Sequence, residues 1–200
     1  YRLMTSNQMS CKTFQVEVPE IYQIEVTNAC NLKCQMCIRD NPLVRRTIGY
    51  LDPELIRLMI KQEDLRGSYF IELQMAGEPL LHPKLKEIIL ILKSSGIKVG
   101  LSTNGMLLQN QLGAIQLLDY MTISVDSTGE DYPDLRVGGS LEQLHRGIDA
   151  VLSLPTRPKV DLQVIDFFDQ PSNLLALESW ASQWDVVTRS VPDCFAAYNG

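Results

Sequence analysis

Strand-like and helix-like segments alternate along most of this 200-residue chain, and this alternation limits the fold more than any other feature. Runs rich in β-branched and aromatic residues are expected to form strands at 21–26, 70–74, 97–101, 121–125, 159–165 and 185–189. Apolar residues recur at helical spacing in 53–63, 83–94, 106–118, 140–153 and 172–183. Pro53 and Ser140 stand where helices commonly begin.

This order of segments predicts an α/β fold, in which right-handed βαβ units surround a parallel sheet. Periodicity leaves two arrangements open, a doubly wound sheet and a barrel. Eight βα repeats do not fit into 200 residues. We therefore expect about six strands in one sheet.

The composition is that of a folded globular domain, since 45% of the residues are hydrophobic. The chain has 18 basic and 24 acidic residues, so no nucleic-acid partner is expected, because such a partner requires a basic face. Arg39, Arg45 and Arg46 form the densest basic group and are interpreted as a solvated loop. No apolar run of about 18 residues is present, so no membrane span is expected.

Three of the five cysteines, Cys30, Cys34 and Cys37, fall within eight residues with the spacing C-x3-C-x2-C. A secreted disulfide scaffold would have an even number of dispersed cysteines, so reduced thiols in the cytoplasm are expected. Closely spaced thiolates select zinc or an iron–sulfur cluster. Zinc requires a fourth ligand, and neither His82 nor His145 lies in a paired ligand motif. Spacing alone favours a cluster and leaves zinc, or chance core cysteines, open.

Polar segments follow the predicted strands. They are MAGEP at 75–79, STNG at 102–105 and SVDS at 124–127. In parallel α/β folds, the carboxyl ends of the strands form the functional site. We therefore expect these segments and the cysteines to face one mouth.

The quoted segments resemble the radical S-adenosylmethionine (SAM) superfamily, in which CNLKCQMC, AGEPLLHP, LSTNG and ISVDS have counterparts in this order. The resemblance covers roughly residues 20–190. It implies a partial (β/α)6 barrel and a [4Fe–4S] cluster on Cys30, Cys34 and Cys37. It also implies that SAM binds the fourth iron through its amino and carboxylate groups. Reductive cleavage of SAM would then give a 5′-deoxyadenosyl radical that takes a hydrogen atom from the substrate.

The resemblance also assigns cofactor contacts near the first two strands. Glu78 is expected to accept a charge-assisted hydrogen bond from the SAM ammonium group. Gly77 is expected to allow close approach of the backbone to the ligand. Ala76 replaces the first glycine of the commoner Gly-Gly-Glu-Pro turn. Met36 stands where an aromatic residue often packs near adenine.

Further cofactor contacts are implied at the later strand ends. Ser102 and Asn104 either approach the methionyl group or ribose of SAM or serve the Asn-Gly turn. Ser124 and Asp126 match the family's Ser-x-Asp. Arg136 lies where many relatives carry an arginine that pairs with the SAM carboxylate, and a simple loop arginine is the alternative.

Several other residues have two open interpretations. Val164 and Ile165 either flank the adenine or pack in the core. His82 is expected to be structural rather than a proton carrier. Cys194 is either a buried hydrophobe or a ligand of an auxiliary cluster, and Cys11 is not expected to bind metal. The expected division is an N-terminal extension at 1–19, a core at 20–190 and a tail at 191–200 that begins a further domain.

The predicted function is that of an oxygen-sensitive, cytoplasmic radical SAM enzyme that receives electrons from a low-potential donor of the flavodoxin or ferredoxin type. The expected substrate is a peptide or a cofactor precursor. One alternative is a tailoring enzyme for a small molecule such as a sugar, nucleoside or lipid precursor. An alternative of another class is a non-catalytic zinc-binding module.

Overall fold

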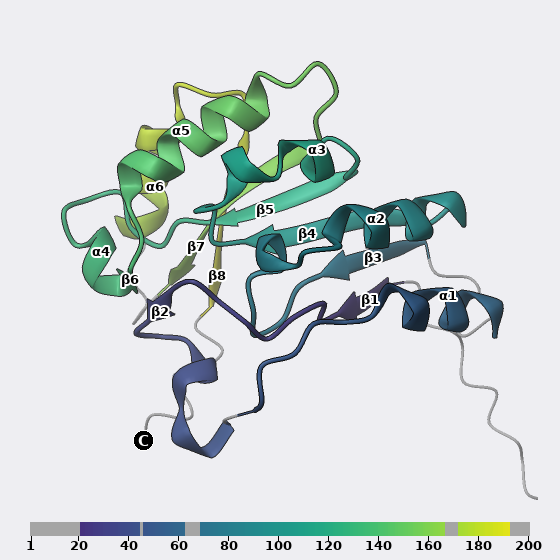
Figure 1. The fold of residues 1–200 in the computed structure, drawn as a ribbon. Coiled ribbons are helices and arrows are strands. Elements are labelled where there is room, and N and C mark those ends of the chain that lie inside the picture. The colour runs from purple at the N-terminus through teal and green to yellow at the C-terminus, as the bar shows by residue number, and fades with distance from the viewer. Residues whose placement is uncertain (1–20, 45, 63–68, 167–171, 193–200) are drawn as a thin grey trace, which may run out of the picture.

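The computed structural model describes residues 21–44, 46–62, 69–166 and 172–192. Within this part of the chain, six parallel strands form one sheet in the order β1-β3-β4-β5-β7-β8 (Figure 1). The strands are β1 (Ile21–Ile24), β3 (Phe70–Leu73), β4 (Lys98–Thr103), β5 (Tyr120–Ser124), β7 (Lys159–Asp166) and β8 (Val187–Pro192). Each one matches an expected strand.

The strand order separates the two arrangements that periodicity left open. A doubly wound sheet reverses its order at a switch point, whereas these strands follow one another in chain order. Within the described ranges no ladder joins β1 to β8, so the sheet is open at that edge. The fold is therefore a partial (β/α)6 barrel, as the resemblance implied.

Helices cover one face of the sheet (Figure 1). The longer ones are α1 (Pro53–Lys61), α2 (Leu85–Ser94), α5 (Leu141–Leu152) and α6 (Ser172–Ala181). Pro53 lies in the first turn of α1 behind Asp52, whose carboxylate accepts from the Glu54 amide at 3.1 Å. Ser140 caps α5 by accepting from the Gln143 amide at 3.2 Å. Both expected helix starts are confirmed.

The expected helix at 106–118 is wrong in its extent. The structure has a 3-10 turn, η4 (Leu108–Asn110), and one short helix, α3 (Leu112–Ile115). Asn110 and Gly113 are weak helix formers. The Gln111 side chain also donates to the Leu80 carbonyl at 3.0 Å, which fixes the break between the two turns.

Short elements that sequence patterns did not predict lie near the strand ends. They are β2 (Lys33–Cys34), β6 (Arg136–Val137), α4 (Tyr132–Leu135), and the 3-10 turns η1 (Ile38–Asp40), η2 (Pro42–Val44) and η3 (Pro79–Leu81). Strands of two residues carry no readable periodicity. Their positions depend on contacts between distant segments.

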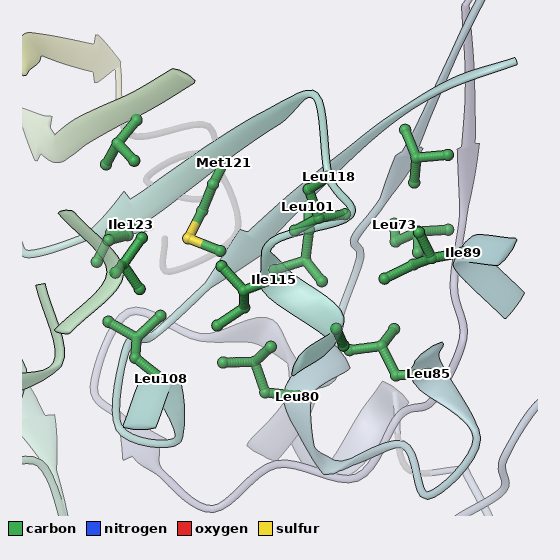
Figure 2. Packing of buried hydrophobic residues seen from close by; sticks show 14 of the residues in the cluster. Leu73, Leu80, Leu85, Ile89, Leu101, Leu108, Ile115, Leu118, Met121 and Ile123 are labelled. Atoms are coloured by element: carbon green, nitrogen blue, oxygen red, sulfur yellow. The ribbon is translucent and has the colours of Figure 1, made fainter. Parts of the chain in front are cut away.

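The core lies between the sheet and the helices. Figure 2 shows Leu101 and Met121 of neighbouring strands with Ile115 of α3 in this layer. Side chains alternate between the two faces of a strand, so every second residue enters this core. Val164 is one of them and is fully buried, which decides its two interpretations in favour of core packing. The other positions face the inner side of the partial barrel.

Several predictions lie outside the described residues. They concern Cys11, Arg45, Cys194, the N-terminal extension and most of the tail. Strand β8 continues to Pro192, two residues past the expected end of the core at 190. No helix in the described ranges is both long and apolar enough to cross a membrane.

Candidate functional site

The cysteine loop, residues 27–37, follows β1 and is tied to the segment after β5. Cys34 belongs to β2, which lies beside β6 (Figure 1). The two strands pair antiparallel, so that Cys34 lies opposite Arg136. The Gln35 amide donates to the Leu135 carbonyl at 3.0 Å. Cys30, Cys34 and Cys37 are all half-buried. The loop is therefore held in place by backbone bonds that leave its thiols near the surface of the site.

The turn that contains Gly77 packs directly on this loop. The Glu78 amide donates to the Ala29 carbonyl at 2.7 Å. A Cβ on Gly77 would lie 1.9 Å from the Thr27 carbonyl oxygen and 2.8 Å from that of Ala29. The close approach at Gly77 is thus to the cysteine loop, and its contact with SAM stays a prediction. The Ala76 amide donates to a Glu25 carboxylate oxygen at 3.2 Å.

Glu78 presents a buried carboxylate with three donated hydrogen bonds. Its Oε1 accepts from the Leu80 amide at 3.0 Å and from the Thr103 hydroxyl at 2.7 Å. Its Oε2 accepts from the Asn104 amide at 2.8 Å. A carboxylate has about four acceptor positions, so one remains for a further donor. Burial raises the pKa of Glu78, and the three donors oppose that shift.

Thr103 was inside the STNG segment but received no predicted role. It is the last residue of β4, and its hydroxyl also accepts from the Gly105 amide at 3.0 Å. A hydroxyl at a strand end, next to an Asn-Gly turn, is the signal that could have identified it. Its function here is to orient Glu78.

Asn104 connects the β4 end to the cysteine loop. Its side-chain amide nitrogen donates to Asn31 Oδ1 at 3.0 Å and lies 3.7 Å from Cys30 Sγ. Its Oδ1 accepts from the Met106 amide at 3.0 Å, which is the expected turn chemistry. The turn interpretation of Asn104 is therefore confirmed, and its contact with SAM stays a prediction. Ser102 instead points to the inner face, where its hydroxyl donates to a Glu72 carboxylate oxygen at 3.2 Å.

Asp126 and Arg136 form a buried ion pair beside the cysteine loop. Arg136 Nε donates to Asp126 Oδ2 at 2.8 Å, and Asp126 Oδ1 accepts from the Ile165 amide at 2.9 Å. Asp126 has a φ of 63°, in the left-handed region that few residues other than glycine adopt. Such backbone strain concentrates at functional sites. Contact of Arg136 with the SAM carboxylate, and any role of half-buried Ser124, stay predictions.

The three half-buried thiols of the cysteine loop are the donor set that an iron–sulfur cluster requires. Burial raises the pKa of the Cys34 thiol to about 11, against the opposing charge of Arg136, and raises that of Cys30. These thiols lose their protons when metal binds. Tyr132 is fully buried, and its hydroxyl has no hydrogen-bond partner among the described residues. In that same part of the chain, no three His, Cys, Asp or Glu side chains are grouped as ligands of a single metal ion. A cluster differs from a single ion because its thiolates bind separate irons.

The basic group near the loop is partly structural rather than merely solvated. Arg39 is half-buried, and its Nη2 donates to the Leu32 carbonyl of the cysteine loop at 2.6 Å. Arg46 pairs with Glu25 through two contacts of 2.6 and 2.7 Å. The interpretation as a solvated loop is therefore wrong for Arg39. Met36 is half-buried, and its predicted place near adenine stays a prediction.

His82 is buried between two backbone groups. Its Nε2 lies 2.9 Å from the Leu51 carbonyl, and its Nδ1 accepts from the Lys84 amide at 3.1 Å. The second bond requires a free lone pair on Nδ1, so Nε2 carries the hydrogen. Burial lowers the pKa of His82. These contacts support the structural role expected for it.

Known proteins share both the sequence pattern and the fold. The model of the radical SAM superfamily matches residues 24–163. A GTP 3′,8-cyclase of Chlorobaculum tepidum is 31% identical over 140 residues, which are 67% of this chain and 41% of that protein. A GTP 3′,8-cyclase of Alkaliphilus metalliredigens is 30% identical over 168 residues, which are 79% of this chain and 51% of that protein. The chain spans about half the length of these curated relatives.

Solved structures agree at the level of the fold. Streptococcus suis SuiB bound to S-adenosylmethionine superimposes with a TM-score of 0.71 at 14% identity, over 87% of this chain and 40% of that chain. BtrN in complex with AdoMet and 2-DOIA gives a TM-score of 0.57 at 19% identity, over 92% and 76%. Family members use a [4Fe–4S] cluster and SAM. The match to the family model, together with the arrangement of the cysteine loop and Glu78, shows that this chain belongs to the radical SAM superfamily of enzymes.

Proposed function

We propose that Cys30, Cys34 and Cys37 bind the [4Fe–4S] cluster and that Glu78 accepts a hydrogen bond from the ammonium group of the SAM on its fourth iron. The observation that supports this proposal most directly is the burial and the hydrogen bonding of Glu78. Its carboxylate is buried, has one acceptor position left, and is joined through its own backbone to Ala29, the residue before Cys30. A charged ammonium donor would offset the burial that now raises the Glu78 pKa.

The other residues of the site would hold and tune the cofactors. The amide of Asn104, 3.7 Å from Cys30 Sγ, favours a thiolate there, and hydrogen bonds to sulfur adjust cluster potentials. Arg136 lies opposite Cys34 in the β2–β6 ladder, where a guanidinium can pair with the SAM carboxylate. When bound, the reduced cluster and SAM supply the radical that takes hydrogen from the substrate.

Further contacts are proposed around the bound SAM. Met36 would pack near its adenine, and Ser102 and Ser124 would offer hydroxyl groups from the inner face of the strands. The turn of Ala76 and Gly77 would border its methionyl group. These assignments rest on the family pattern and on the position of each residue at a strand end.

The proposed substrate is a cofactor precursor or a peptide. The cyclases of Chlorobaculum and Alkaliphilus are named for GTP, and a Pyrococcus furiosus protein 31% identical over 93 residues is named for modifying the cofactor of an oxidoreductase. That match covers 44% of this chain and 25% of that protein. These names support the cofactor-precursor class, and a small-molecule tailoring enzyme is the alternative.

Electrons are proposed to come from a low-potential donor of the flavodoxin or ferredoxin type. The reaction would begin with a one-electron reduction of the cluster, whose three cysteine ligands are only half-buried. A reducing compartment keeps such thiols free, so we place the protein in the cytoplasm.

Reductive SAM cleavage tests the proposal directly. The chain is purified without oxygen, reconstituted with iron and sulfide, reduced with dithionite and mixed with SAM. We expect a brown protein that releases 5′-deoxyadenosine, measured by liquid chromatography and mass spectrometry. Glu78→Gln should weaken SAM binding about tenfold or more, because it removes a charge-assisted hydrogen bond.

Two variants distinguish loss of a cluster ligand from a general loss of stability. Cys34→Ala should abolish cleavage, while Glu142→Gln, on the exposed face of α5, should leave it unchanged. Full cleavage by Cys34→Ala would refute the assignment of the ligands. A colourless protein that contains zinc and does not bind SAM would instead support the non-catalytic zinc module.

A further inference from the structure

The inner face of the sheet, opposite to the helices, carries mostly polar side chains. Residues that are aligned between neighbouring strands lie side by side on one face. One row holds Ser102, Thr122, Asp161 and the apolar Val187, and the next holds Ser124, Gln163 and Arg189. In a closed (β/α)8 barrel these positions are filled mainly by branched apolar residues. A polar inner face indicates a place for a ligand rather than a second core.

Aromatic residues close the amino end of this inner face. A Cβ on Gly100 would lie 2.3 Å from the ring of Phe70, so that ring covers the Gly100 position. The rings of Phe70 and Tyr120 meet edge to face at 6.4 Å. The two polar rows therefore lie between an aromatic floor and the cysteine loop at the carboxyl ends of the strands.

Arg189 carries the main positive charge of these rows. Its Nη2 donates to Thr122 Oγ1 at 2.7 Å, and its Nε lies 3.7 Å from Asp161 Oδ2. The second distance is too long for a hydrogen bond. Within the described part of the chain, Arg189 Nε has no hydrogen-bond partner, although it is buried. Tyr120 donates its hydroxyl hydrogen to Asp161, so this carboxylate is held from another side.

The guanidinium of Arg189 thus has N–H donors that are not used in hydrogen bonds within the described part of the chain. Arginine has five N–H groups in a planar fork, and the interaction with Thr122 uses one of them. The side chain is 39% exposed although Nε is buried, so a ligand would approach the N–H groups of Nη1 and Nη2 rather than Nε. Such a fork matches the paired oxygens of a carboxylate or a phosphate.

We propose that Arg189, positioned by Thr122, binds an oxyanion of the substrate, either a carboxylate or a phosphate. This inference rests on the proposed function, because it names the substrate class of the same site. Arg189 is aligned through Gln163 with Ser124, which ends β5 two residues before Asp126. An anion bound at Arg189 would therefore place the rest of the substrate beneath the cofactors, within reach of the radical.

Binding of small anions to the reconstituted, SAM-loaded protein tests the proposal. The probes are phenyl phosphate and benzoylglycine, which distinguish phosphate from carboxylate, and neutral benzoylglycinamide. Isothermal titration calorimetry should detect binding of at least one anion and weaker binding of the amide. Arg189→Gln should weaken anion binding about tenfold or more, and Arg189→Lys should restore part of it. The control Arg146→Gln removes an exposed arginine of α5 and should bind like the wild type.

Cleavage of SAM without substrate is measured in parallel. Arg146→Gln should retain it, and the circular dichroism spectrum of Arg189→Gln should match that of the wild type, which shows that this variant is folded. Equal anion binding by Arg189→Gln and wild type would overturn the inference, as would a wild type that cleaves SAM but binds neither anion. Failure of SAM cleavage in a wild type that still binds an anion through Arg189 would instead count against the proposed function.

Discussion

Replacing Gly77 by alanine tests how the cysteine loop is held. The added Cβ would lie 1.9 Å from the Thr27 carbonyl oxygen and 2.8 Å from the Ala29 carbonyl oxygen. Both neighbours are backbone atoms, so no side chain can rotate away to make room. The loop or the turn must move by about 1.5 Å to reach a normal contact distance. Such a shift would also break the 2.7 Å bond from the Glu78 amide to Ala29.

The expected cost of Gly77→Ala is about 2–4 kcal/mol in the free energy of unfolding, because overpacking and a lost buried hydrogen bond act together. Urea unfolding followed by circular dichroism measures this cost. Iron bound per chain after anaerobic reconstitution should also fall, because Cys30 directly follows Ala29.

A matched control is Gly113→Ala in α3, where nothing lies within 4 Å of an added Cβ. Alanine is the better helix former, so this variant should unfold with equal or slightly higher free energy. If Gly77→Ala keeps wild-type stability and iron content, the packing of the turn on the cysteine loop is not what holds the site.

Three further predictions concern buried groups. Burial lowers the pKa of His82 below the unfolded value of about 6.5, so the wild type should lose stability as the pH falls below 6.5. Urea titrations at pH 7.5 and 5.5 should show that His82→Gln reduces this loss and that His145→Gln does not. Asp126→Asn should lower the free energy of unfolding in urea by about 3–5 kcal/mol, because it leaves the buried Arg136 charge without its partner, while asparagine tolerates the left-handed backbone. A loss of less than about 1 kcal/mol would contradict a buried ion pair. Tyr132→Phe should leave the metal-free protein as stable or about 1 kcal/mol more stable, and a clear loss would reveal a partner for its hydroxyl.

The strands were predicted well from the sequence because their signal is local. Alternation in 121–125 and 159–165 depends on neighbouring residues, and both strands form where they were expected. The same alternation could have separated Val164 from Ile165, since only one of two adjacent residues can face the core. The failed helix at 106–118 shows the limit of this signal. Its apolar residues serve the core through two short turns rather than through one continuous helical face.

The candidate site was predicted as a set of residues but not as a network. Glu78 was identified, whereas Thr103, which orients it, was not. Arg136 was expected to pair with the SAM carboxylate, and in the structure it pairs with Asp126. Arg189 belongs to no sequence motif, and only the alignment of β5, β7 and β8 brings its guanidinium to Thr122.

The sequence by itself determined the succession of strands and helices along the chain and the C-x3-C-x2-C spacing, because both depend on residues close together in the sequence. The tertiary structure decided which groups meet. The Asn104 amide reaches Glu78 across 26 positions, and Arg189 reaches Thr122 across 67. Such contacts depend on strand order and register, which place distant residues side by side on one face of the sheet.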